Sequence, residues 1–316
     1  MARQRIFLAG HRGLAGSAIL RALEARKAGG DSSEIIVRTR AELDLLDQGA
    51  VREFFAAEKP SHVILAAARV GGIKANRDQP VEFLLDNLKI QNHVIEHAWR
   101  SGVQKLLFLG SSCIYPKLAP QPIHESAFLT GPLEPTNEAY AIAKIAGIEL
   151  CQALRREYGV DFISAMPTNL YGPHDNFDPE SSHVLPGLLY KFHRAKTEKL
   201  PSVTLWGSGT PRREFMHADD LASACLVLLD KYSSPEPINV GTGEDVTVRE
   251  LADLIRATVG FDGKLEWDSS QPDGTPRKLL DVSRIKSLGW SPRVSLPEGL
   301  ASTYRWFVEH RAESRA

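Results

Sequence analysis

The sequence predicts an α/β fold in which a doubly wound parallel sheet carries a smaller C-terminal α/β lobe. Two observations indicate this fold class. Short apolar runs alternate with longer helical stretches, and the first run leads directly into a glycine-rich turn and a helix. Such alternation with short connections is typical of the Rossmann arrangement, whose ligands bind at the carboxyl ends of the strands.

Each expected element is a short apolar run or a helical pattern. The expected strands are 5–9, 34–38, 62–66, 105–109, 161–165 and 203–206, and the expected helices are 14–26, 48–58, 81–101 and 137–158. After residue 172 the composition changes to a loop rich in Asp, Asn, Ser and Pro. We therefore expect 1–172 to form the nucleotide-binding domain, to which segments at about 202–245 return, and 173–316 to form mainly the substrate lobe.

Composition excludes several classes of function. The chain has 316 residues and a net charge of -1, which argues against nucleic-acid and anionic-membrane partners. Its apolar runs are far shorter than the roughly 18 residues that span a bilayer, and no signal segment opens the chain, so we expect a cytoplasmic protein. Cys113, Cys151 and Cys225 suggest neither a disulfide framework nor a metal site, and we place Cys151 and Cys225 in the core.

The glycine-rich turn follows the first expected strand. Its spacing is G-x-x-G-x-x-G over residues 10–16, which differs from the usual G-x-G-x-x-G fingerprint. Glycines allow the backbone to approach a pyrophosphate, and the following helix offers free amides and the positive end of its dipole. The turn therefore predicts a dinucleotide site, although an ordinary glycine-rich turn has the same spacing.

The charge near the second strand indicates the kind of dinucleotide. A site for NAD usually has an acidic residue at the end of this strand, but here Arg38 and Arg40 lie there, and Arg12 lies in the glycine turn. Guanidinium groups suit a 2'-phosphate, so we expect NADP(H) as the cofactor. Arg38 is the weakest of the three candidates. The alternative is that all three arginines are ordinary surface charges.

Tyr140 and Lys144 are one helical turn apart in the expected helix 137–158. They therefore project from the same face, where the ammonium could lower the pKa of the phenol. A phenol tuned in this way can pass a proton to a carbonyl oxygen. The spacing by itself is also found on solvated helix faces.

The glycine turn, Ser111 after the fourth expected strand and the Tyr-x-x-x-Lys helix together resemble the extended short-chain dehydrogenase/reductase family over nearly the whole chain. Runs such as GHRGLAGSAI, FLGSSCIYP, MPTNLYGPHDNF and WGSGTPRREF are similar to members that act on a keto sugar carried by GDP. The resemblance implies an NADP-dependent oxidoreductase with epimerase activity, which would epimerise GDP-4-keto-6-deoxy-D-mannose at C3 and C5 and reduce it at C4. It also implies a homodimer that pairs helices 81–101 and 137–158 of two copies.

The resemblance also implies roles for five residues. Ser111 would bond the substrate carbonyl, Tyr140 would donate a proton, and Lys144 would bond the nicotinamide ribose. Cys113 would be the base and His183 the acid of epimerisation. The chemistry of the two side chains supports a proton-transferring pair but leaves open which one takes the proton, and a packed cysteine and a solvated loop histidine remain the alternatives.

Further site residues are expected on the cofactor and substrate sides. The cofactor set is Gly10, His11, Arg12, Gly13, Leu14, Ala15, Gly16, Arg40, Asp44, Leu45, Leu109, Gly110, Ser111, Ser112, Tyr140, Lys144, Pro167, Thr168, Asn169, Leu170 and His183. The substrate set is Lys191, Trp206, Arg213, Asp273 and Lys278. We expect His174 and His217 to be structural.

Two other functions are compatible with the fold. Sugar-nucleotide 4-epimerases and 4,6-dehydratases would favour an acidic second-strand end or an acidic pair where this chain has Ser112 and Cys113. A catalytically silent NADP(H) sensor would normally have lost the Tyr or the Lys. The first is disfavoured because neither acidic feature is present, and the second because Ser111, Tyr140 and Lys144 are all present.

Overall fold

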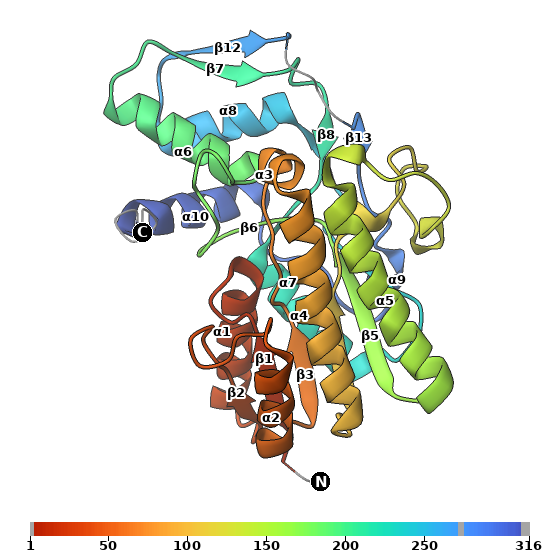
Figure 1. Cartoon of the computed structure of the whole chain (residues 1–316). Helices are drawn as coiled ribbons and strands as arrows, with labels where there is room; N and C mark the ends of the chain where they lie inside the picture. Colours follow the sequence, from red (N-terminus) through yellow and green to blue (C-terminus); the bar gives the residue numbers. More distant parts are fainter. Residues whose placement is uncertain (1–2, 271–274, 311–316) are drawn as a thin grey trace.

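The computed structural model describes residues 3–270 and 275–310, and its centre is a six-stranded parallel sheet between two layers of helices (Figure 1). In order across the sheet, the strands are β10 (Ile238–Val240), β5 (Asp161–Pro167), β4 (Lys105–Leu109), β3 (His62–Leu65), β1 (Arg5–Ala9) and β2 (Glu34–Ile36). All neighbouring strands are parallel. The chain starts inside the sheet at β1, adds β2 on one side and then crosses to the other, so the predicted doubly wound fold is confirmed.

Helices cover both faces of this sheet. On one face α1 (Leu14–Ala28) packs against α7 (Ala218–Lys231), and on the other α2 (Gln48–Glu58), α4 (Pro80–Arg100) and α5 (Glu138–Tyr158) lie side by side (Figure 1). Because both faces are covered, the strands are nearly continuous apolar runs, and every residue of β4 is buried.

A second, smaller layer of helices and strands lies beyond the carboxyl ends of the central strands (Figure 1). Its helices are α6 (Val184–Thr197), α8 (Val248–Val259) and α10 (Leu296–His310). Its strands form three small sheets: β7 (Ser202–Trp206) with β12 (Lys264–Asp268); β8 (Arg212–Arg213) between β11 (Val246–Thr247) and β13 (Arg277–Lys278); and β6 (Asn169–Tyr171) with β9 (Phe215–His217). The remaining short helices are α3 (Ile73–Asp78), α9 (Ser283–Ser287), η1 (Ser112–Ile114), η2 (Glu125–Ala127) and η3 (Pro135–Asn137). This part has its own hydrophobic core, which includes Phe192, Leu251 and Leu300.

Three strand predictions need correction. The second strand ends at Ile36 rather than at 38, because Arg38 turns away to pair with Glu58. The run at 203–206 is a strand, but it pairs with β12 outside the central sheet. The sixth central strand is instead β10, whose three residues are too short to give a recognisable pattern. The division into 1–172 and 173–316 stays a prediction.

Within the described ranges, no helix combines the length and the apolar character needed to cross a bilayer. In the same ranges, no cluster of three or more His, Cys, Asp or Glu side chains could hold a metal ion.

Candidate active site

The glycine turn between β1 and α1 is shaped by close backbone contacts. Gly10 has a φ of +90°, and a Cβ there would lie 2.6 Å from the Ala67 nitrogen. A Cβ on Gly16 would lie 2.0 Å from the Gly10 oxygen, so both positions require glycine. Gly13 caps α1 with no side-chain hydrogen bond, and the first turn of α1 has no acidic residue. The first-turn amides are therefore open to an anion, which fits a dinucleotide pyrophosphate.

The expected adenosine end of the cofactor site is rich in charge. Arg12 is exposed, and Arg40, with 78% of its side chain exposed, pairs with Asp44 at 3.5 Å. Arg38 is committed elsewhere, because it pairs with Glu58. The sequence reading missed Glu42, whose carboxylate caps the Thr39 amide at 2.7 Å. Of the three arginines expected at this end, Arg12 and Arg40 are thus the two that do not pair with Glu58.

The remaining cofactor segments follow β4 and β5 at the same edge of the sheet. Gly110 donates a backbone hydrogen bond to Ala165, which joins the two segments. Thr168 and Asn169 both donate to the carbonyl oxygen of Glu214, at 3.4 and 2.8 Å. The cofactor residues expected after these two strands therefore lie side by side.

Tyr140 and Lys144 share one face of α5, as expected. Lys144 is buried, its Nζ donates to the Leu109 carbonyl at 2.9 Å, and it lies 5.8 Å from the centre of the Tyr140 ring. Phe83 of α4 packs edge-on against Tyr140, with ring centres 6.4 Å apart. The helix pair α4 and α5 thus fixes the phenol from two sides.

The expected direction of the Tyr140 pKa is wrong. Burial raises the pKa of Tyr140 well above its ordinary value, and the nearby Cys113 adds to the rise, whereas a hydrogen bond with Ser111 opposes it. Burial also lowers the pKa of Lys144 to about 7, so its ammonium is only partly populated near neutral pH. The phenol is therefore protonated in this arrangement, which is the state that a proton donor needs.

Ser111 and Cys113 lie at the short helix η1, just beyond β4. The Ser111 hydroxyl accepts a hydrogen bond of 3.2 Å from the Cys113 amide and thereby caps η1. The Cys113 sulfur accepts hydrogen bonds from Asn137 Nδ2 at 3.3 Å and from Lys278 Nζ at 3.5 Å. These two donors would solvate a thiolate, the form of cysteine that can take a proton from carbon.

His183 precedes the first residue of α6 and is exposed at the rim of the site. Surrounding protein desolvates the imidazolium, and the charge of Lys278 adds to this, so both lower the pKa of His183. The loop that carries it is fixed by Gly72, whose amide donates to the Ser181 carbonyl at 2.8 Å. Lys278 therefore lies close enough to influence both members of the expected epimerisation pair.

The expected substrate residues fall into two groups. Arg213 of β8 and Lys278 of β13 are direct neighbours across two parallel strands, so two cations stand side by side near Cys113. Lys191 of α6 donates to the Thr204 carbonyl on β7, and Trp206, two residues further along this strand, is 71% exposed. Within the described residues, no hydrogen bond or ion pair joins Lys191 or Trp206 to the group around Cys113 and Tyr140. Asp273 lies outside the described residues.

Other expected residues have mainly structural contacts. His217 is buried, caps α7 and packs edge-on against Tyr171. His174 packs against Trp306 in the smaller lobe. Cys151 and Cys225 are fully enclosed in the core, and burial raises the pKa of each to about 12.

A sequence model of the NAD dependent epimerase/dehydratase family matches residues 6–241. The chain belongs to this family. The glycine turn and the Tyr140–Lys144 helix both lie within the matched residues, so the family assignment covers the part of the chain that forms the cofactor side of the site.

Relatives within the epimerase/dehydratase family match the chain over its full length. GDP-L-fucose synthase 1 of Arabidopsis thaliana is 59% identical over 306 residues, covering 97% of this chain and 94% of the relative. GDP-L-fucose synthase of Escherichia coli K12 is 55% identical over 324 residues, covering 100% of both chains. The solved GDP-L-fucose synthetase of Naegleria fowleri bound to NADP is 28% identical, with a TM-score of 0.90 over 100% of this chain and 98% of that one.

Besides Glu42, three further residues of this family member were missed by sequence reasoning. Asn137 contacts the Cys113 sulfur, Phe83 contacts the Tyr140 ring, and Glu214 holds the Thr168–Asn169 segment. Only Asn137 had a usable signal, since it lies three residues before Tyr140 and thus on the same side of the helix start. Phe83 and Glu214 reach the site through tertiary packing, which no local pattern reveals.

Proposed function

We propose that this protein converts GDP-4-keto-6-deoxy-D-mannose to GDP-L-fucose by 3,5-epimerisation followed by NADPH-dependent reduction at C4. The observation that carries the proposal is the position of the Cys113 sulfur. It accepts hydrogen bonds from Asn137 and Lys278 beside the Ser111 and Tyr140 pair. A simple reductase needs only the pair, whereas an added sulfur base suits proton exchange at carbon. The full-length likeness to relatives named for this activity supports the same conclusion.

The ketone at C4 makes the hydrogens at C3 and C5 acidic. Ser111 and Tyr140 polarise the C4 oxygen, so that removal of either proton gives an enolate whose charge lies on that oxygen. Cys113 takes the proton, and His183 returns one from the opposite side. Tyr140 then supplies the proton that completes the C4 hydroxyl. One oxyanion site thus serves both reactions.

The cofactor is NADP(H), which supplies the hydride to C4 when bound. The residues of the site fit it, because the α1 amides are free of side-chain caps and glycines occupy the close backbone approaches. In the proposed site, residues 10–16 hold the pyrophosphate, Arg12 and Arg40 meet the 2'-phosphate, and Lys144 bonds the ribose. Asp44 and Leu45 line the adenosine end, while residues 109–112 and 167–170 line the nicotinamide end.

The GDP part of the substrate needs cations and a flat surface. Arg213 and Lys278, adjacent across β8 and β13, suit the two phosphates. Lys191 of α6 and Trp206 of β7 suit the outer phosphate and the guanine or sugar. Asp273 remains a proposed contact of the substrate.

We also propose a homodimer formed by α4 and α5 of two copies. Between these helices lies a groove lined by Trp99, Leu150 and Leu154, and Leu85 and Ile142 are exposed on the same two helices. Light scattering of the purified protein tests the stoichiometry. A cytoplasmic location is consistent with Cys113, Cys151 and Cys225 all being free thiols.

The test incubates the purified protein with GDP-4-keto-6-deoxy-D-mannose and NADPH in D2O. The expected result is NADPH consumption with GDP-L-fucose as product, carrying deuterium at C3 and C5. Reduction without deuterium at these carbons would instead indicate a simple 4-reductase. Absence of NADPH consumption would favour a sensor and refute the proposal.

A further inference from the structure

Glu214 is a fully buried carboxylate next to Arg213, between β8 and β9, with 0% of its surface exposed. Within the described residues it forms no ion pair, although buried charges usually have a basic partner. Burial raises the pKa of Glu214, and backbone hydrogen bonds oppose the rise. Burying a carboxylate without a basic partner costs free energy, so we expect Glu214 to have a specific role in the structure or in function.

The carboxylate joins two segments that are far apart in the sequence. Its Oε1 accepts hydrogen bonds from the Gly243 amide at 2.7 Å and the Thr242 hydroxyl at 3.3 Å. Its Oε2 accepts from the Leu280 amide at 3.0 Å. Gly241 lies so close that an added Cβ would be 2.3 Å from Oε1. The carboxylate thus fills a slot between the turn after β10 and the segment after β13.

The segment at Leu280 carries the cation that reaches the reaction centre. Lys278, two residues before Leu280, donates to the Cys113 sulfur at 3.5 Å and is the strand neighbour of Arg213. On its other side, Glu214 uses its own carbonyl to hold Thr168 and Asn169. Glu214 therefore lies where the substrate cations meet the segment expected to contact the nicotinamide.

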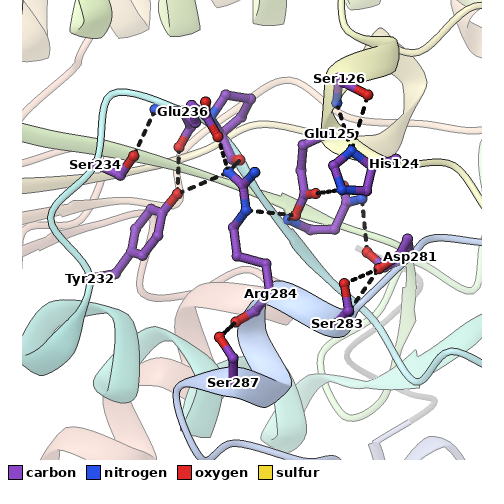
Figure 2. Close-up of polar contacts among 12 residues, drawn as sticks. His124, Glu125, Ser126, Tyr232, Ser234, Glu236, Asp281, Ser283, Arg284 and Ser287 are labelled. Atoms are coloured by element: carbon purple, nitrogen blue, oxygen red, sulfur yellow. Dashed lines mark hydrogen bonds and ion pairs between the residues drawn. The ribbon is translucent and has the colours of Figure 1, made fainter.

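A second set of contacts anchors the same segment further along the chain. Asp281 donates its amide to the Ile123 carbonyl at 2.9 Å, and Arg284 pairs with the buried Glu125 at 3.9 Å. Figure 2 shows this polar cluster, with Arg284 between Glu125 and Glu236 and with Asp281 beside Ser283. These contacts hold the segment downstream of Leu280, and Leu279 donates its amide to Gln121 Oε1 at 2.8 Å and accepts from the Ile123 amide at 2.7 Å. Glu214, the residue next to Arg213, is therefore the tether that links this segment to the turn after β10.

We propose that Glu214 is a positioning residue that fixes Lys278 and Arg213 relative to Cys113 through its hydrogen bonds to Leu280 and Gly243. It touches neither the sulfur nor the sugar and acts through the segment that it holds. Its importance for turnover depends on the proposed function, whereas its effect on the Lys278–Cys113 contact does not.

Glu214→Gln is the primary variant. It keeps the size of the side chain, but an amide nitrogen cannot accept a hydrogen bond, so one of the two segments loses its anchor. Gly241→Ala should act alike by displacing the carboxylate without changing its charge. Asp220→Asn is the matched control, because Asp220 is 2% exposed and accepts from the Arg293 and Val294 amides at 2.9 and 3.0 Å. This variant also replaces a buried carboxylate that accepts backbone hydrogen bonds, but the amides that it binds do not belong to a segment of the proposed site.

The first readout is alkylation of Cys113 by iodoacetamide in the full-length protein, followed by mass spectrometry of the peptide. Cys151 and Cys225 are buried and should not react. Because the reacting sulfur would lose the hydrogen bond that Lys278 donates to it, Glu214→Gln and Gly241→Ala should slow alkylation roughly three- to tenfold, as Lys278→Gln should. Asp220→Asn should react at the wild-type rate even though it lowers the melting temperature.

The second readout is turnover of the keto sugar with NADPH. Glu214→Gln should raise KM and lower kcat, together reducing kcat/KM by at least about tenfold, while Asp220→Asn keeps both at a temperature where it is folded. The positioning role is overturned if Cys113 of Glu214→Gln is alkylated at or above the wild-type rate. It is also overturned if Glu214→Gln, like Asp220→Asn, changes only the melting temperature. If the alkylation order holds but the wild type does not turn over the keto sugar, the positioning role stands and the proposed function fails.

Discussion

Replacing Asn137 by alanine tests the contact that supports the sulfur. Asn137 Nδ2 donates to the Cys113 sulfur at 3.3 Å, while its Oδ1 is buried and accepts no hydrogen bond from the described residues. A hydrogen bond to a charged group contributes about 1.5–3 kcal/mol, and about 1.4 kcal/mol corresponds to tenfold in rate. Proton exchange at the sugar should therefore slow by roughly ten- to a hundredfold.

Stability should change little in the same variant. Asn137 precedes α5 without capping it through its side chain, so alanine removes no cap hydrogen bond. It also removes an unsatisfied buried acceptor, whose cost offsets the lost donor contact. We expect the free energy of unfolding to shift by less than about 1 kcal/mol in a urea titration.

The assay follows deuterium entry at C3 and C5 by NMR, with the substrate and oxidised cofactor in D2O, so that reduction does not consume the ketone. Asn137→Asp serves as a graded comparison, because a carboxylate beside the sulfur should slow exchange further than alanine does. Fluorescence titration of NADPH should give the wild-type dissociation constant for both variants. Wild-type exchange in Asn137→Ala would show that this hydrogen bond plays no part in proton abstraction.

Three more outcomes are expected. Gly72→Ala should reduce proton exchange at C3 and C5 by at least about tenfold and leave NADPH binding unchanged. The reason is that a Cβ on Gly72 would lie 2.2 Å from the Ser182 carbonyl oxygen, next to His183. Normal exchange in this variant would mean that the loop adjusts freely. Arg40→Glu should weaken NADPH binding roughly tenfold or more and leave NADH binding nearly unchanged. Equal dissociation constants of the wild type for NADPH and NADH would remove the argument for a 2'-phosphate site. For Lys144, whose pKa burial lowers to about 7, the unfolded chain binds one more proton than the folded chain above that pH. In urea titrations of the ligand-free protein, the wild type should therefore gain stability relative to Lys144→Met between about pH 7 and pH 9, and parallel pH profiles would show that Lys144 keeps its ordinary affinity for protons.

Local patterns were sufficient for most of the central sheet. The apolar runs at β1, β3, β4 and β5 begin where they were expected, because strands covered on both faces must be continuously apolar. β10 could not be predicted, since three residues carry no period and the strand is defined by its pairing with β5. β7 was placed in the wrong sheet for a related reason, because a strand pattern does not specify its partner.

The site shows the same limit in its electrostatics. The four-residue spacing correctly predicted that Tyr140 and Lys144 share a face, but it could not predict how deeply that face is buried. Burial reverses the expected shift of the Tyr140 pKa. Arg38 likewise was a plausible phosphate ligand until Glu58, twenty residues away in the sequence, was found to bind it.

The pKa shifts indicate where positive and negative charge can reside in this site. Burial favours the neutral forms of Tyr140 and Lys144. For His183, desolvation by the surrounding protein and the charge of Lys278 act in the same direction. The Cys113 sulfur differs from these groups, because Lys278 donates a hydrogen bond to it. In the proposed mechanism, Asn137 and Lys278 would stabilise a thiolate at Cys113 through their hydrogen bonds, while Tyr140 keeps its proton until the sugar oxygen needs it. In that mechanism the same phenol first stabilises the enolate and then completes the reduction.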